Sequence, residues 1–314
     1  MKCYKEAMKF GKVEHPRQLN APIPQLIPKI GSQAENPSKP STPLRIHLGA
    51  PVWGKKEWVG KLYPPKTQAK DYLKYYALQM NSIELNTTYY RIPDPTTVQN
   101  WKQVVPEDFT FCPKVYMGIS QFGKLAEIPE ITKRFCETSL QFEKNLGVCF
   151  LQLPPYFGPE RILILNRFFK LLPSQLPLAI EFRHPGWFHR NQIIDLAFQL
   201  LSDHQISPVI TDALGRPDVL HSSLSTQKVM IRFLGNSLHS SDYARLDQWV
   251  SRIGEWAELG IRDVYFFIHQ HEEEGVIELV QYLVEQLNET YEIKRGIRLK
   301  GIDLNRAMPQ IELF

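Results

Sequence analysis

The sequence alternates between short strand-like and helix-like segments from residue 44 to residue 288. Eight apolar runs have the length and composition of strands, and they occupy residues 44–49, 82–86, 109–115, 147–153, 178–182, 206–212, 228–234 and 263–269. Segments with the apolar period of amphipathic helices lie between most of them. This order of elements over about 245 residues is typical of a (β/α)₈ barrel.

An open, doubly wound sheet would show the same alternation. That fold has a glycine-rich phosphate-binding turn after its first strand, and no such turn follows residues 44–49. We therefore predict an α/β protein with a single TIM-type barrel over residues 44–289. A proline-rich N-terminal arm, residues 1–43, precedes the barrel, and a C-terminal tail, residues 290–314, follows it.

The arm has seven prolines between residues 16 and 43 and few large apolar residues. Such a segment cannot bury enough apolar surface to fold alone, so we expect it to be disordered or wrapped on the barrel surface.

Composition narrows the class of protein. No segment approaches the roughly 20 apolar residues of a membrane span, so we predict no membrane partner. The N-terminus lacks the apolar core of a signal peptide. The four cysteines form no C-x-x-C pair, which fits buried thiols in a reducing cytoplasm and predicts a cytoplasmic protein. The net charge of +4 permits an anionic partner without indicating one.

Barrel enzymes carry their chemistry at the C-terminal ends of the strands, which together form the mouth of the barrel. Because side chains alternate along a strand, each predicted strand directs a polar group inward near this end. These groups are His47, Glu84, Asn86, Lys114, Gln152, Glu181, Arg183, Asp212, Arg232 and His269. Such charges are costly to bury unless they are paired or used, so the set predicts a ligand site. The alternative for Glu181 and Arg183 is a buried ion pair without chemistry.

Four segments then point to a family. They are I-E-L-N-T-T-Y-Y-R at 83–91, F-L-Q-L-P-P at 150–155, E-F-R-H-P-G-W at 181–187 and D-V-Y-F-F at 263–267. In this order the chain resembles the YecE-like family, domain-of-unknown-function family 72, from about residue 45 to residue 287. The resemblance implies a TIM-type barrel of unestablished activity, with a structural likeness to apurinic endonuclease and sugar isomerase barrels.

The chain departs from the family pattern at three places in the predicted mouth. L-G-A-P-V-W-G at 48–54 replaces a G-T-S-G-W-like turn, and R-F-L-G at 232–235 lacks the histidine of R-L-H-G. H-Q-H-E at 269–272 replaces an asparagine pair. These changes put the transfer of any family chemistry to this chain in question.

The acidic and basic groups of the mouth suggest candidate catalytic residues, namely Glu181, Glu84, Asp212 and Lys114. Glu84 and Glu181 come from different strands, and a pair of carboxylates can act as general acid and base, as in glycosidases. The alternative is that Lys114 and Arg183 merely neutralise them.

A divalent metal is a second candidate, with His269 and His271 as ligands beside the carboxylates. The alternative is an ordinary polar loop whose acidic residues begin the last helix, where the helix dipole favours them.

The basic groups of the mouth suit a phosphate or carboxylate, and the aromatic residues around it suit a base or sugar face. The predicted substrate-binding set is Asn86, Tyr89, Arg91, Gln152, Arg183, His184, Trp187, Arg232 and Trp53. Packing beneath the loops is the alternative for each aromatic residue. The set predicts a small anionic substrate or a nucleic acid.

The chain ends in Q-I-E-L-F, which resembles the peptide that binds bacterial sliding clamps. Gln310, Ile311, Leu313 and Phe314 would be the anchors of such a contact. The alternative is that the tail folds back on the barrel.

We therefore predict a hydrolase-like enzyme acting on a phosphorylated or nucleic-acid-related substrate, with a repair-type phosphodiester hydrolase as the first hypothesis. A carbohydrate-active isomerase or glycosidase that uses Glu84 and Glu181 is the alternative. A non-catalytic ligand-binding barrel is the third.

Overall fold

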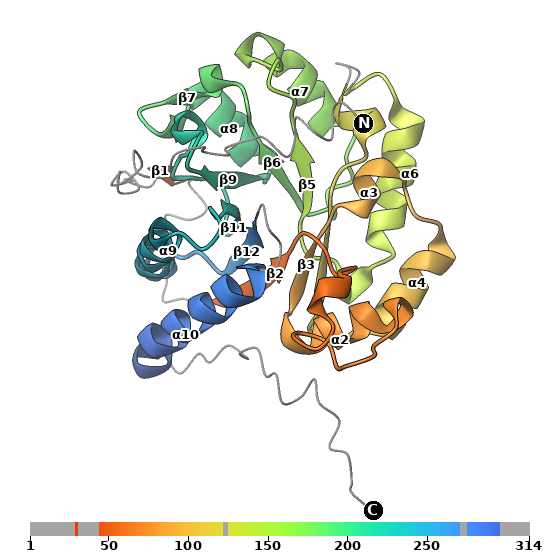
Figure 1. Cartoon of the computed structure of the whole chain (residues 1–314). Helices are drawn as coiled ribbons and strands as arrows, with labels where there is room; N and C mark the ends of the chain where they lie inside the picture. The colour runs from red at the N-terminus through yellow and green to blue at the C-terminus, as the bar shows by residue number, and fades with distance from the viewer. Residues whose placement is uncertain (1–28, 31–43, 122–124, 271–274, 296–314) are drawn as a thin grey trace, which may run out of the picture.

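The computed structural model describes residues 29–30, 44–121, 125–270 and 275–295. Within these ranges, eight parallel strands form a nearly closed barrel surrounded by helices (Figure 1). The barrel strands are β2 (Arg45–Ala50), β3 (Ser82–Leu85), β4 (Thr110–Pro113), β5 (Cys149–Gln152), β6 (Leu178–Glu181), β9 (Ser207–Ala213), β11 (Lys228–Leu234) and β12 (Asp263–His269). The predicted α/β class and TIM-type barrel are confirmed, and every predicted strand overlaps an observed one.

The strand order is β4-β3-β2-β12-β11-β9-β6-β5. Isolated bridges from Phe111 to Leu146 and from Lys114 to Phe150 join the two end strands, β4 and β5. Backbone hydrogen bonds reinforce this junction, including one of 2.9 Å from the Val115 amide to the Phe150 carbonyl. The ring of strands therefore brings all their C-terminal ends to one side.

Helices cover the outside of the strands (Figure 1). The longer ones are α2 (Tyr72–Gln79), α4 (Pro95–Gln103), α6 (Pro129–Leu140), α7 (Ile162–Phe169), α8 (Asp195–Asp203), α9 (Ser240–Glu258) and α10 (Gly275–Arg295). Two single-turn helices, α3 (Thr87–Tyr90) and α5 (Met117–Ser120), follow β3 and β4. Short 3₁₀ turns cover Lys56–Trp58, Ala69–Asp71, Glu143–Asn145, Pro159–Arg161, Pro185–Trp187 and Pro217–Val219.

The start of α4 shows how the sequence sets a helix boundary. The Asp94 carboxylate accepts a 2.8 Å hydrogen bond from the Thr97 amide, which would otherwise lack an intrahelical partner. Pro95 follows at the first helical position, where its missing N–H costs nothing.

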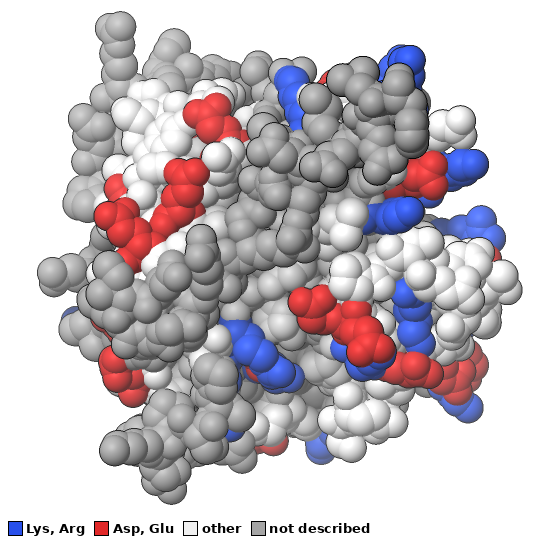
Figure 2. Space-filling view, turned by 90° about the horizontal axis from the view of Figure 1, so that it is seen from below, with Lys and Arg blue, Asp and Glu red and all other residues white. Residues whose placement is uncertain are grey.

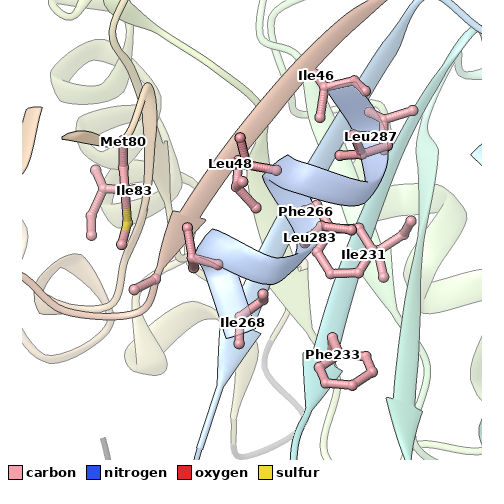
Figure 3. Packing of buried hydrophobic residues seen from close by; sticks show 14 of the residues in the cluster. Ile46, Leu48, Met80, Ile83, Ile231, Phe233, Phe266, Ile268, Leu283 and Leu287 are labelled. Atoms are coloured by element: carbon pink, nitrogen blue, oxygen red, sulfur yellow. The ribbon is translucent and has the colours of Figure 1, made fainter. Parts of the chain in front are cut away.

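Two apolar layers hold the barrel together. The interior is filled by buried side chains from the strands and from the residue before β5: Cys112, Val148, Phe150, Ala179, Val209, Met230, Tyr265 and Phe267. The outer layer lies between strands and helices, where Ile46, Ile231 and Phe266 pack with Leu283 and Leu287 of α10 (Figure 3). Full burial of each such side chain contributes roughly 1.5–3 kcal/mol, so the outer layer fixes the helices around the strands.

Gly49 allows β2 and β3 to approach each other closely. A Cβ atom at this position would lie 2.0 Å from the Ser82 carbonyl oxygen, and Gly49 and Ser82 are partners in the β2–β3 pair. Any larger residue would therefore force the two strands apart.

Part of the predicted N-terminal arm lies against the barrel. Strand β1 (Lys29–Ile30) pairs in parallel with β10 (Ser223–Leu224), and Lys29 forms an ion pair with Asp195. The small β7 (Phe188–His189) and β8 (Gln192–Ile193) form an antiparallel pair after β6. The rest of the arm and the motif at 310–314 fall outside the described residues. Among the helices that the structure does describe, none is long and apolar enough to cross a membrane.

The expectation that Asp212 faces the barrel mouth is wrong. Its carboxylate points outward to α9, where it accepts hydrogen bonds of 2.9 Å from Arg245 Nη1 and 2.8 Å from Trp249 Nε1. Val209 faces the interior and Ile210 the outer layer. Because both faces of β9 are apolar, the hydrophobic pattern could not fix its register.

His47 also lies outside the mouth. It faces the interior near the start of β2, where its ring stacks on Tyr265 at 4.3 Å and its Nε2 lies 3.1 Å from Asp263 Oδ1. Asp263 is the first residue of β12, so this contact belongs to the opposite end of the barrel.

We predict that Asp212→Ala destabilises the fold by roughly 3 kcal/mol, because it leaves the buried Arg245 guanidinium with one carboxylate fewer. Urea unfolding at pH 7 would measure this loss. Asp108→Ala, at an exposed position before β4, is the matched control and should change the unfolding midpoint little. Equal midpoints for both variants would contradict the assigned role of Asp212.

Candidate functional site

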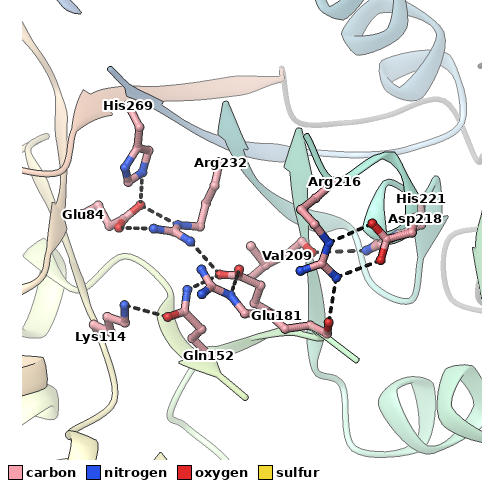
Figure 4. A network of polar contacts seen from close by, with 11 residues as sticks. Glu84, Lys114, Gln152, Glu181, Val209, Arg216, Asp218, His221, Arg232 and His269 are labelled. Carbon is pink, nitrogen blue, oxygen red and sulfur yellow. Dashed lines mark hydrogen bonds and ion pairs between the residues drawn. The ribbon is translucent and has the colours of Figure 1, made fainter. Parts of the chain in front are cut away.

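Polar side chains from different strands meet at the mouth (Figure 4). We call this group the mouth network, and it consists of Glu84, Lys114, Gln152, Glu181, Arg183, Arg232 and His269. All seven were predicted from the sequence to face the mouth. Most are buried, and His269 retains 17% of its side-chain surface. Strand ends far apart in sequence thus place their charges within hydrogen-bond distance of one another.

Arg232 is the centre of the network. Its Nε and Nη2 each donate a 3.0 Å hydrogen bond to the Glu84 carboxylate, one to each oxygen. Its Nη1 donates a 2.7 Å bond to Glu181 Oε2. A planar guanidinium matches a carboxylate in this two-bond arrangement, so Arg232 fixes Glu84 in orientation and holds Glu181 beside it.

Glu181 extends the network towards β5 and β4. It also accepts 2.8 Å bonds from Arg183 Nε and from Gln152 Nε2. The other end of the Gln152 amide accepts a 3.1 Å bond from Lys114 Nζ. Gln152 therefore links the carboxylate to the lysine without bringing their charges into direct contact.

Both glutamates are ionised at neutral pH. Burial alone would raise the pKa of Glu84, but the Arg232 guanidinium and the bonded His269 together outweigh it and hold that pKa well below its usual value. The pKa of Glu181 is lowered in the same way, with burial opposed by Arg183 and Arg232. Both carboxylates therefore act as acceptors, and neither is a proton donor near pH 7.

His269 forms a dyad with Glu84. Its Nε2 lies 2.8 Å from Glu84 Oε2. Burial, with the Arg232 charge also acting against protonation, lowers the pKa of His269, so the imidazole is neutral at pH 7. Since an ionised carboxylate can only accept, Nε2 carries the proton and donates it to the bond. The Nδ1 atom is then left with its lone pair, which is the form required of a general base.

Lys114 has an unusual environment for an ammonium group. Its Nζ lies 4.5 Å from the ring centre of Tyr89 and 5.6 Å from that of Phe150. Burial is the main cause, and Arg232 the next, of a pKa lowered to about 7. Near neutral pH the lysine therefore populates both its ammonium and its amine form.

Two more predicted residues lie at the edge of the network. Asn86 donates a 3.0 Å bond to Glu84 Oε1, and Tyr89 contacts Lys114 through its ring. Their predicted substrate-binding roles stay predictions, but their positions are compatible with them.

Four predicted residues make their main contacts, among the described residues, away from the mouth network. Trp187 is buried, donates to the Phe157 carbonyl at 2.6 Å and packs on Phe182. His184 accepts a 3.0 Å bond from the Gly186 amide and so shapes its own turn. Trp53 packs edge-on against Trp101, and Arg91 is exposed. Packing beneath the loops, the alternative for the two tryptophans, describes what the structure shows.

Sequence reasoning missed Thr211 and Arg216. Thr211 pairs in register with Arg232, faces the interior as Val209 does, and is buried with no hydrogen-bond partner for its hydroxyl within the described chain. Arg216 donates a 3.0 Å bond to the Arg183 carbonyl and a two-bond pair to Asp218, so it supports the loop after β6. The R-P-D sequence at 216–218 was the feature that could have indicated the Arg216–Asp218 pair.

The predicted metal site is only half described, because His271 lies outside the described residues. His269 is bonded to Glu84, and the part of the chain that the structure covers contains no group of three or more His, Cys, Asp or Glu side chains placed to hold an ion. Metal binding at these positions stays a prediction.

We predict that Arg232→Met lowers stability at pH 7 by roughly 3–5 kcal/mol, because two buried carboxylates lose their shared partner. The dependence of stability on pH should also weaken. In the native protein the ionised glutamates stabilise the fold above their unfolded pKa of about 4.3, and this stability is lost as the pH falls. In the variant, the pKa of Glu84 rises because Glu84 loses its strongest cationic partner, whereas Arg183 still lowers the pKa of Glu181, so less stability is lost as the pH falls.

Urea unfolding between pH 4 and pH 8 would test both statements. Arg167→Met, an exposed position on α7, is the control and should retain the native profile. A variant at position 232 with the native pH profile would show that Arg232 does not set the ionisation of the two glutamates.

Comparison with known proteins agrees with the fold. The family model described as Protein of unknown function DUF72 matches residues 47–299. The YecE protein of Escherichia coli K12 is 26% identical over 263 residues, which cover 78% of this chain and 93% of YecE. The YunF protein of Bacillus subtilis is 29% identical over 152 residues, or 46% of this chain and 52% of YunF.

A solved structure is also similar. A DUF72 family protein from Enterococcus faecalis V583 aligns with a TM-score of 0.62 over 79% of this chain and 97% of its own, at 23% identity. At this identity the likeness shows the fold alone. The family model, however, spans most of the sequence, and the chain therefore belongs to the DUF72 family of proteins of unknown function.

Proposed function

We propose that this protein is an enzyme whose reaction includes a proton transfer to a general base. Its substrate would be a small phosphorylated or otherwise anionic molecule bound at the mouth. The observation that carries the proposal is the Glu84–His269 dyad, in which an ionised carboxylate orients a neutral imidazole. This arrangement leaves a nitrogen lone pair on the imidazole, and a positioned base of this kind contributes typically about 10²–10⁴-fold to a rate.

The charge balance of the network supports an anionic substrate. Its two carboxylates, Glu84 and Glu181, are matched by the permanent charges of Arg183 and Arg232. Protonated Lys114 adds one uncompensated positive charge. A buried excess charge attracts an anion, and the anion would in turn stabilise the ammonium form of the lysine.

The paired-carboxylate alternative is less suited to this geometry. A glycosidase of that type needs one carboxylic acid with a raised pKa to protonate the leaving group. The pKa values of Glu84 and Glu181 are both lowered, and their oxygens accept bonds from arginine, asparagine, histidine and glutamine side chains. These carboxylates are better placed to orient Arg232 and His269 than to react.

Phosphodiester hydrolysis is one form of the proposed chemistry, in which His269 would take the proton from an attacking water. A long nucleic acid would also need a continuous basic surface. On the face shown in Figure 2, lysine and arginine side chains of the described residues are scattered among acidic ones. The single excess charge at Lys114 suits a small phosphorylated molecule, which we favour over a polymer.

The test is a panel of sugar phosphates, nucleotides and abasic-site DNA, assayed for binding by calorimetry and for turnover. We predict that His269→Gln keeps binding within about threefold and lowers kcat roughly 10²–10⁴-fold, because glutamine retains the donor to Glu84 but removes the base. Lys170→Met, on the surface beside α7, is the control and should leave both quantities unchanged. Unchanged kcat in the His269 variant would overturn the assignment of the base, and binding without turnover of any compound would favour a non-catalytic barrel.

A further inference from the structure

Lys114 is a buried lysine whose charge has no carboxylate partner in the described structure. Its Nζ has one hydrogen bond, to the neutral Gln152 amide oxygen, and otherwise faces the rings of Tyr89 and Phe150. Other lysines, such as Lys102 and Lys144, lie against glutamates at the surface. The two rings attract an ammonium group by cation–π contact, but together with one neutral amide they offset only part of the hydration that the group loses.

The charged groups around Lys114 also disfavour its ammonium form. The titratable and charged side chains that face it from the neighbouring elements are Glu84, Tyr89, Glu181, Arg183, Arg232 and His269. The two carboxylates in this set are already bonded to arginines, so their attraction for the lysine is largely offset. The free amine is therefore accessible near neutral pH, where an exposed lysine is almost wholly protonated.

We propose that Lys114 is a nucleophile that forms an imine with the carbonyl carbon of an aldehyde or ketone. A buried amine in a barrel mouth, without a carboxylate partner in the described structure, has the properties of lysines that form such adducts. That the carbonyl compound also carries a phosphate or carboxylate rests on the function proposed above, whereas the reactivity of the amine does not.

The step balances without a further reagent. The Nζ lone pair forms a bond to the carbonyl carbon, and the π electrons move to oxygen, which takes up a proton while nitrogen loses one. The resulting carbinolamine expels its oxygen as water after a second protonation, as the nitrogen lone pair forms the C=N bond, and the protonated imine then releases its N–H proton. The products are the imine and one water molecule, and they contain the same atoms as the amine and the carbonyl compound.

The test is reductive trapping of the full-length protein with pyridoxal and with pyridoxal 5′-phosphate. Each aldehyde is added between pH 6 and pH 10, borohydride reduces the imine to a stable amine, and peptide mass spectrometry locates the label. We expect Lys114 to be labelled at pH 7.5 at least roughly tenfold faster than exposed Lys144 and Lys170, with a half-maximal rate near pH 7.

Lys114→Arg keeps a cation at this position without a nucleophilic amine, and circular dichroism would verify its fold. It should lose the fast label and keep the slow labels on exposed lysines. A native protein in which Lys114 reacts no faster than Lys144, or only as the pH approaches 10, would overturn the proposal.

The two aldehydes separate this inference from the proposed function. Fast labelling by both, without protection by inorganic phosphate, supports the nucleophile and counts against the anionic substrate. Binding of phosphate at the mouth without fast labelling by either aldehyde supports the anionic site and overturns the nucleophile.

Discussion

The charged hydrogen bonds from Arg232 to two glutamates are the interaction on which the rest of the mouth depends. One guanidinium on β11 joins Glu84 of β3 to Glu181 of β6, and all three groups are buried. Burial makes each charge expensive alone and strongly attractive to the others. Both carboxylates are consequently ionised, and this determines the proton on His269, the orientation of Gln152 and the charge left over at Lys114.

This arrangement separates groups that orient from groups that can react. Glu84, Glu181 and Arg232 satisfy one another's charges and hydrogen bonds. This centre is therefore most stable in its present geometry and ionisation state. Within the described residues, His269 and Lys114 are each attached to the network by one hydrogen bond, and each has an atom capable of taking a proton. A rigid charged centre with adjustable groups around it suits a site that must keep its shape through a reaction.

Much of the fold could be predicted from sequence because the alternation of apolar runs is strong and each barrel strand is short. The prediction of which side chains face the barrel interior was also right where a strand has one clearly polar position near its end, as at Glu84, Gln152 and Arg232. It failed at Asp212 because Val209 and Ile210 are both apolar, so either register buries a hydrophobic face.

The reactivity of the site could not be predicted in the same way. Trp53 and Trp187 show that an aromatic residue near a strand end can equally well pack beneath a loop, and this depends on contacts distant in sequence. The sequence around Lys114 does not distinguish it from other lysines, because its lowered pKa arises from burial and from neighbours on other strands.

The closure of the barrel has a consequence for this lysine. Strands β4 and β5 meet through isolated bridges, whereas every other neighbouring pair described here forms a ladder. Lys114 stands on one side of this seam and Gln152 on the other, so the hydrogen bond between them spans it. The distance between β4 and β5 therefore sets the geometry of that hydrogen bond, and with it the environment of the Lys114 amine.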